Sequence, residues 1–154
     1  IRWWMSSPSA RLKGDVLMAY VDGFLIPVPK KNMAAYRKMS QKAGAIWMKH
    51  GALDYKECVG ADLTPEGVTA TFPKVLKAKT DETVVFSWIV YASKADRDRI
   101  MKKVMSDPLM QAPDCPFDPK RMCVAGFDVI VDMAPAKPKK KAPPKKKAKK
   151  KSAR

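Results

Sequence analysis

The best candidates for proton transfer in this sequence are His50, Asp22 and Tyr91. His50 is the chain's single histidine, and an imidazole can exchange protons near neutral pH. It closes the apolar stripe of a predicted helix, so the spacing turns its ring toward the interior. The alternative is a structural histidine that the dipole stabilises at the helix C-terminus. Asp22 is expected to meet solvent at a sheet end or to find a hydrogen-bond partner inside, and spacing alone does not bring it or Tyr91 to His50.

Most enzyme classes with local sequence signatures, and the usual metal sites, are disfavoured. It contains no Gly-rich phosphate loop, no Gly-x-Ser-x-Gly elbow and no His-Glu-x-x-His motif. The cysteines Cys58, Cys115 and Cys123 form no Cys-x-x-Cys pair, and a single histidine cannot complete the usual zinc clusters. We therefore expect no metal and no cofactor. Since an odd number of cysteines leaves a thiol unpaired, we expect a cytoplasmic protein in a reducing environment.

The element that must position these groups is the stretch of β-branched and aromatic residues from Val84 to Tyr91, which predicts a strand. Side chains alternate across a strand, so one face holds Val84, Phe86, Trp88 and Val90, and the other holds Val85, Ser87, Ile89 and Tyr91. Both faces are mostly apolar, and both need cover. Two helices can cover only one face of a small sheet. A second copy of the protein is therefore expected to cover the other.

Five further elements follow from the hydrophobic periodicity. Strands are predicted over residues 19–26, 52–59 and 123–133, and helices over residues 29–49 and 93–106. Pro27 is expected to end the first strand because a proline cannot donate to a sheet ladder. Gly51 is expected to end the first helix in a left-handed conformation, and Ser93 is expected to cap the second. Residues 60–82 form a long connection, which is often functional or in contact with a partner.

The order β-α-β-β-α-β predicts an α+β fold of the ferredoxin-like kind, with a four-stranded antiparallel sheet and both helices on one face. Two such sheets packed face to face would form a dimeric α+β barrel. Related barrels bind small apolar molecules between sheet and helices, an analogy of fold alone. The residues predicted to line this pocket are Tyr36, Trp47, Trp88 and Arg121. The two tryptophans have an equally simple explanation as core residues, and Arg121 as a surface partner of Asp118.

Most of the formal charge of +16 lies at the C-terminal end of the chain. Residues 135–154 hold ten lysines, one arginine and no acid, whereas residues 15–134 carry a net charge of only +2. The Lys/Pro/Ala composition of residues 134–154 predicts a disordered tail, which either binds nucleic acid by counterion release or only keeps the protein in solution. The candidate nucleic-acid-binding residues are Lys139, Lys140, Lys141, Lys145, Lys146, Lys147, Lys149, Lys150 and Lys151. Residues 1–17 show no period and are expected to be an N-terminal extension, so the domain is predicted over residues 18–133.

The sequence has Tyr-Val-Asp-Gly-Phe at residues 20–24, His-Gly-Ala-Leu at residues 50–53 and Glu-Thr-Val-Val-Phe-Ser-Trp-Ile-Val-Tyr at residues 82–91. Together with segments at residues 27–32, 36–39, 116–118, 120–122 and 126–127, these motifs resemble the YbaA-like family of uncharacterised bacterial proteins. The resemblance implies a dimeric α+β barrel of the ferredoxin-like kind. It implies no activity and no catalytic residues, because the family has no established reaction.

The sequence is compatible with three functions. The first is a homodimer that binds a small apolar molecule in the pocket between sheet and helices. The second is a non-enzymatic dimer tethered to nucleic acid by its tail, and the third is a cofactor-free enzyme that resembles a monooxygenase or an isomerase. No membrane partner is expected, because no apolar run is long enough to cross a bilayer.

Overall fold

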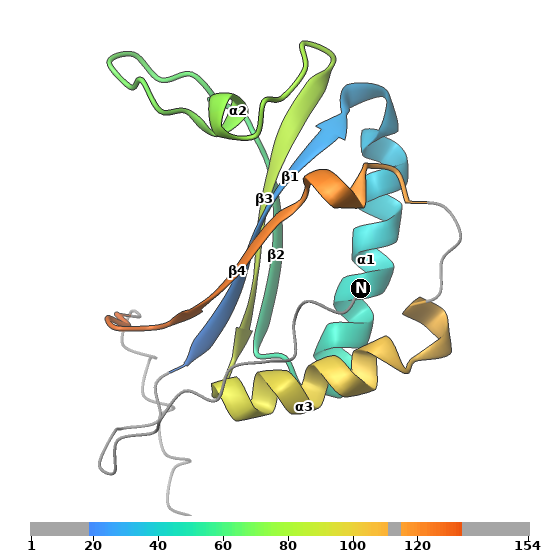
Figure 1. Ribbon diagram of the computed structural model, residues 1–154. Helices are drawn as coiled ribbons and strands as arrows, with labels where there is room; N and C mark the ends of the chain where they lie inside the picture. Colours follow the sequence, from blue (N-terminus) through green and yellow to red (C-terminus); the bar gives the residue numbers. More distant parts are fainter. Residues whose placement is uncertain (1–18, 111–114, 134–154) are drawn as a thin grey trace, which may run out of the picture.

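An antiparallel sheet with the strand order β2-β3-β1-β4 organises the computed structural model, which describes residues 19–110 and 115–133. Its strands are β1 (Tyr20–Pro29), β2 (Asp54–Val59), β3 (Glu82–Tyr91) and β4 (Cys123–Asp128). The α-helices are α1 (Met33–His50), α2 (Phe72–Val75) and α3 (Lys94–Met105), and the 3-10 helices are η1 (Lys30–Asn32), η2 (Pro108–Met110) and η3 (Pro119–Arg121). Figure 1 shows α1 and α3 on one side of the sheet and α2 on the other. The predicted α+β class with a four-stranded antiparallel sheet is confirmed.

Two predicted regions lie outside the described residues. They are the N-terminal extension, residues 1–17, and the Lys/Pro/Ala-rich tail, residues 134–154, which contains all the candidate nucleic-acid-binding lysines. The helices and strands of the described chain all fall between residues 20 and 128, within the predicted domain.

β1 continues through Pro29, three residues further than the sequence predicts. Beyond Leu25 the strand pairs with β3 alone, because the pairing with β4 stops there. The backbone N–H of Lys30 donates to the carbonyl of Asp81 at 2.8 Å, and N–H groups alternate sides along a strand. The nitrogens of Pro27 and Pro29 therefore point to the unpaired edge, where a missing N–H costs no ladder hydrogen bond. The expectation that Pro27 ends the strand was wrong for this reason.

The ends of the two long helices carry the predicted capping residues. Gly51 follows α1 with a φ of 111°, a left-handed conformation that glycine adopts without steric cost. At the start of α3, the Ser93 hydroxyl accepts from the Asp96 N–H at 3.1 Å and donates to the Asp96 carboxylate at 3.0 Å. The start of α1 differs from the prediction. Pro29 ends β1 and precedes η1, so it opens this 3-10 helix and not the α-helix.

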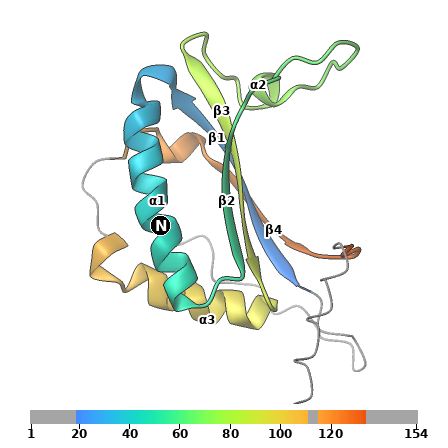
Figure 2. The ribbon, with the colours of Figure 1, turned by 180° about the vertical axis from the view of Figure 1, so that it is seen from behind.

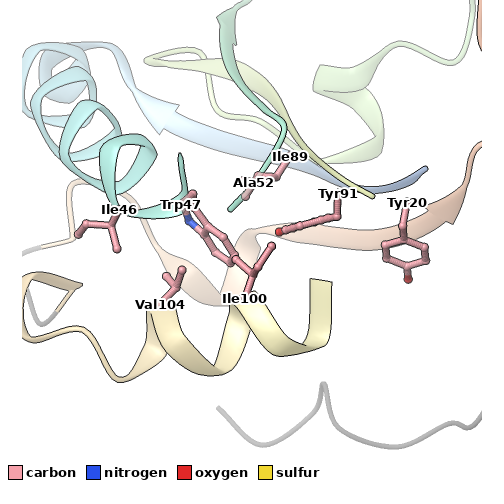
Figure 3. Packing of buried hydrophobic residues seen from close by; sticks show 8 residues of the cluster. All are labelled: Tyr20, Ile46, Trp47, Ala52, Ile89, Tyr91, Ile100 and Val104. Atoms are coloured by element: carbon pink, nitrogen blue, oxygen red, sulfur yellow. The ribbon is translucent and has the colours of Figure 1, made fainter. Parts of the chain in front are cut away.

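The main core lies between the sheet and the two long helices (Figure 3). Trp47 of α1 meets Tyr91 of β3 edge to face, with ring centroids 6.1 Å apart. Ile100 and Val104 of α3 are fully buried in the same cluster. The apolar side chains of α1 and α3 thus bury one face of β3, as its sequence requires.

β4 ends at Asp128, five residues before the end of the predicted strand. Asp128 pairs with Tyr20, the first residue of β1, and the N–H of Val129 then donates to the carbonyl of Ala19 at 2.9 Å. The ladder stops because its partner strand begins there. The predicted strand over residues 123–133 was too long, since Ile130 is exposed beyond the ladder.

The opposite face of the sheet is mostly apolar and lacks a layer of long helices. This open sheet face holds Val21, Gly23, Leu25, Cys58, Phe86, Trp88, Val90, Cys123, Ala125 and Phe127, which share one side by strand register. The same register places the ion pair of Asp54 and Lys56 at its β2 edge. The view from behind in Figure 2 shows that α1 and α3 do not cover it. Phe86 is 41% exposed and Phe127 is 56% exposed. Phe72 of α2 reaches only one end of the face, with its ring centroid 6.2 Å from that of Phe86.

Candidate functional site

A groove of about 320 Å³ lies between α1 and β2, which is an edge strand of the sheet. α1 contributes Arg37, Gln41, Gly44 and Met48, and β2 contributes Tyr55 and Glu57. The residues from α1 are three or four positions apart and therefore share one face of the helix. The two residues from β2 are two positions apart and share one face of the strand. The groove thus has a helix wall and a strand wall.

Glu57 is held between two tyrosines from different elements. The Tyr36 hydroxyl of α1 donates to Glu57 Oε2 at 2.7 Å, and the Tyr55 hydroxyl of β2 donates to Oε1 at 2.7 Å. Burial and the neighbouring Glu57 charge raise the pKa of both phenols well above their ordinary range. Both hydroxyls therefore keep their protons at neutral pH. The cluster presents one carboxylate whose two oxygens each accept from a fixed phenol.

Gly44 allows the Tyr55 ring to lie against α1. A Cβ at position 44 would stand 2.8 Å from two carbon atoms of that ring, well inside the distance at which non-bonded carbons pack. A glycine inside a helix costs about 0.5–1 kcal/mol relative to alanine. The close approach of Tyr55 gives a physical reason for this glycine, and it sets the shape of the groove.

Asp22 and Tyr91 do come together, but in the core and not in the groove. Both side chains are 0% exposed. The Tyr91 hydroxyl donates to Asp22 Oδ2 at 3.1 Å, and Arg97 Nε donates to the same oxygen at 2.9 Å. Burial raises the pKa of Asp22, and the hydrogen bonds from Arg97 and Tyr91 oppose this effect. Of the two expectations for Asp22, the internal partner is the one that the structure shows.

His50 lies apart from this pair, at the C-terminal end of α1. Its Nε2 is 3.0 Å from Asp107 Oδ2, which also accepts from Lys49 Nζ at 3.1 Å. Asp107 Oδ1 accepts from the N–H of Leu109 at 3.1 Å. Its hydrogen bonds with His50, Leu109 and Lys49 lower the pKa of Asp107 to about 2. His50 therefore joins the end of α1 to the turn after α3, and it does not line the groove.

The four residues predicted to line one pocket are not brought together. Tyr36 reaches the groove through Glu57, whereas Trp47 belongs to the core. Trp88 is on the open sheet face, where its ring centroid lies 5.3 Å from that of Phe86. The two tryptophans are separated because alternation along β3 points Trp88 away from the helices, and apolar side chains pack between sheet and helices.

Arg121 is also remote from the groove. It forms an ion pair with Glu82, and its Nη2 donates to the carbonyl of Lys77 at 3.0 Å. The Asp118 carboxylate instead accepts from the N–H of Lys120 at 3.0 Å, at the start of η3. Arg121 thus fastens the segment before β4 to the start of β3.

Four charged or hydroxyl groups in these clusters were not among the sequence candidates: Tyr55, Glu57, Arg97 and Asp107. Arg97 lies three and seven positions before Ile100 and Val104, a helical spacing that predicts a buried side chain and could have found it. Tyr55 and Glu57 alternate on a predicted strand, but nothing in that pattern indicates that Tyr36 would meet them. Asp107 has no such signal, because its partners come from the end of another helix.

Within residues 19–110 and 115–133, no group of three or more histidine, cysteine, aspartate or glutamate side chains could hold a metal ion. No helix in this part of the chain is both long and apolar enough to cross a membrane.

Comparison with known proteins gives one consistent result. A family model described as protein of unknown function (DUF1428) matches residues 19–119. The chain is 45% identical over 117 residues to the uncharacterized protein YbaA of Escherichia coli strain K12, and equally to the uncharacterized protein YbaA of Shigella flexneri. Each alignment covers 75% of this chain and 99% of the relative.

Proposed function

The chain belongs to the DUF1428 family of proteins of unknown function, as its resemblance to YbaA-like proteins predicted, and we propose that it is a homodimer that binds a small, mostly apolar molecule in the groove between α1 and β2. The observation that carries this proposal is the convergence of the Tyr36 and Tyr55 hydroxyls on the two oxygens of Glu57 beside an open groove. A few fixed polar groups on a largely apolar wall are typical of sites for small molecules. Met48, Gly44 and the Tyr55 ring form the apolar part of the wall.

The proposed assembly is a dimeric α+β barrel of the ferredoxin-like kind. The sheet order β2-β3-β1-β4, with both long helices on one side, supports this arrangement. The open sheet face supplies the surface for the second copy, because a contiguous apolar patch of this kind marks an interaction site. The three cysteines are all free and exposed, which supports a reducing compartment, and we assign the protein to the cytoplasm.

Retention of a ligand by the purified full-length protein tests the proposed site. Native mass spectrometry with an unbiased search for retained small molecules should find a ligand on the wild-type protein. Glu57→Gln and Tyr55→Phe should fold and lose this ligand, because each removes one polar partner from the groove wall. His50→Gln is the matched control, since His50 does not line the groove and an amide can still donate to Asp107. A folded Glu57→Gln protein that retains its ligand undiminished would refute the site. Incubating the retained molecule with the protein then shows whether it is only bound or is turned over.

The charge distribution favours a second function, the tethering of the dimer to nucleic acid. Residues 135–154 carry ten lysines and one arginine, and the rest of the chain contributes little net charge. A tail of this composition binds polyanions without sequence preference through counterion release. This function is compatible with the first, because it uses a different part of the chain.

A further inference from the structure

Different residues of the groove supply its hydrogen-bond donors and its acceptors. We propose that the groove takes a small molecule that carries both a carboxylate and a hydroxyl or amino donor on a short apolar body. This inference rests on the proposed binding function and adds the chemical class of the ligand.

The wall around Glu57 offers acceptors to a ligand. The protons of Tyr36 and Tyr55 are both donated to Glu57, so Tyr55 presents the lone pairs of its oxygen. Each Glu57 oxygen accepts one of these hydrogen bonds and has a further lone pair. The Ser40 hydroxyl donates to the carbonyl of Tyr36 within α1, at 3.0 Å. A ligand that meets this wall must therefore bring its own donor.

Arg37 supplies the opposite chemistry from the same face of α1. Its side chain lines the groove and is exposed, and it has no ion pair with any carboxylate in the described part of the chain. Glu57, the acid of the groove, accepts instead from its two tyrosines. A guanidinium presents two parallel N–H donors that match a carboxylate. The groove thus carries one cation and one anion, and a ligand with complementary groups leaves neither unpaired.

The size of the groove limits the body that joins the two groups. The α1 residues that line the groove run from Arg37 to Met48, and the Tyr55 ring lies against Gly44 between them. The volume of about 320 Å³ is at the small end of the range for ligand pockets. A benzene ring that carries both a carboxylate and a donor is small enough for this volume. Its ring would lie on the apolar wall formed by Gly44, Tyr55 and Met48.

A matched set of probes tests this ligand class with the full-length protein. The set is para-hydroxyphenylacetate, para-aminophenylacetate, phenylacetate, which lacks the donor, and para-hydroxyphenylethanol, which lacks the carboxylate. NMR titration should show that one of the two bifunctional probes binds about tenfold or more tightly than phenylacetate and para-hydroxyphenylethanol. The two bifunctional probes distinguish a hydroxyl donor from an amino donor.

Variants show which residue recognises each polar group of the ligand. Arg37→Gln should abolish the preference for the acid over the alcohol, whereas Lys38→Gln, the matched control outside the groove, should keep it. Glu57→Gln should weaken the preference for the ring that carries a donor, because it replaces an acceptor oxygen with an amide donor. Equal binding of all four probes, or an acid preference that survives Arg37→Gln, would overturn the ligand class. If the probes fail while native mass spectrometry finds another ligand that depends on Glu57, the ligand class is wrong and the proposed function stands; if no ligand of any kind is found, both are wrong.

Discussion

Arg97 and Asp22 form a buried ion pair that joins α3 to the sheet, and it gives the residue-scale prediction with the largest energetic effect. Arg97→Met should destabilise the protein by about 3–5 kcal/mol, because it leaves the Asp22 carboxylate buried without its cation. The double variant Asp22→Asn and Arg97→Met should recover part of this loss. Urea unfolding measures each value, with the exposed Arg99→Met as control. A single variant that is no less stable than the double variant would contradict the pairing.

The ion pairs of Asp107 predict how the stability of the fold changes at low pH. Its pKa of about 2 in the folded protein lies below the ordinary value of about 3.9 for an aspartate, so the folded state binds this proton less readily than the unfolded state. The stabilisation is therefore complete above about pH 4 and is lost as the pH falls toward about 2. The melting temperature of the wild type should exceed that of Asp107→Asn at about pH 5, and the difference should shrink as the pH falls to about 2 and below. A difference that stays constant across this interval would show that the His50 and Lys49 contacts do not depend on the Asp107 charge.

Part of the candidate site could be predicted from residue types and their spacing. Tyr36 was found because it lies on the buried stripe of a helix, and this required only periodicity. Glu57 was missed because its significance depends on Tyr36, which is 21 positions away and comes from another element. His50 was found as a chemical group, yet its partner Asp107 comes from the turn after α3. Contacts between elements depend on tertiary packing, which spacing along one element does not contain.

At the scale of elements, the contact between Gly44 of α1 and Tyr55 of β2 predicts an unusual helix substitution. Gly44→Ala should improve helix propensity by about 0.5–1 kcal/mol. Its Cβ would meet the Tyr55 ring, however, so the ring must move and ligand retention should fall. Native mass spectrometry and thermal unfolding test the two effects separately. Ala35→Gly, on the exposed side of the same helix, controls for propensity alone. Ligand retention at the wild-type level in Gly44→Ala would mean that the position of Tyr55 does not define the groove.

Most elements could be predicted from the sequence, and the errors fall at their ends. β3 was found as a run of β-branched and aromatic residues, and α1 and α3 were found because their apolar residues repeat with the helical period. The ends of β1 and β4 were placed wrongly because each depends on a neighbouring strand. Pro27 and Pro29 continue β1 only because β4 does not pair there, and β4 stops only because β1 begins at Tyr20.

At the scale of the whole molecule, the open sheet face predicts a dimer that the cysteines can report. Cys58 and Cys123 lie in one row across this face, with Phe86 and Leu25 between them, and Cys115 is exposed outside the sheet. Maleimide labelling of Cys58 and Cys123 should slow as the protein concentration rises, whereas labelling of Cys115 should not change. Light scattering should give the mass of a dimer, and Trp88→Asp should give a monomer. A micromolar monomer whose three cysteines label at rates independent of concentration would contradict the dimer.

The open sheet face could be predicted from the sequence, because β3 has two apolar sides and two helices can bury only one of them. The described structure shows α1 and α3 on one side, with Phe86 and Phe127 exposed on the other. The identity of the covering surface could not be predicted in the same way. Burial of an apolar face is favourable with any partner that excludes water. The choice of partner depends on the shape of the face and on the charges at its rim.

The last prediction separates the folded domain from the tail. Residues 135–154 hold 11 of the basic residues without an acid, so the tail should carry any affinity of this protein for nucleic acid. Log affinity of the full chain for duplex DNA should fall steeply with log salt, toward an ideal slope of about −0.9 for each phosphate that a basic residue neutralises. A chain that ends at Met133 should keep its fold and its oligomeric state, because the helices and strands described here all lie before that residue. Fluorescence anisotropy at several salt concentrations compares the two chains. The shortened chain should bind DNA far more weakly and with a shallow salt slope, since residues 15–134 have a net charge of only +2. If it binds duplex DNA as tightly as the full chain, the affinity lies in the folded domain, and the distribution of net charge along the sequence does not identify the binding surface.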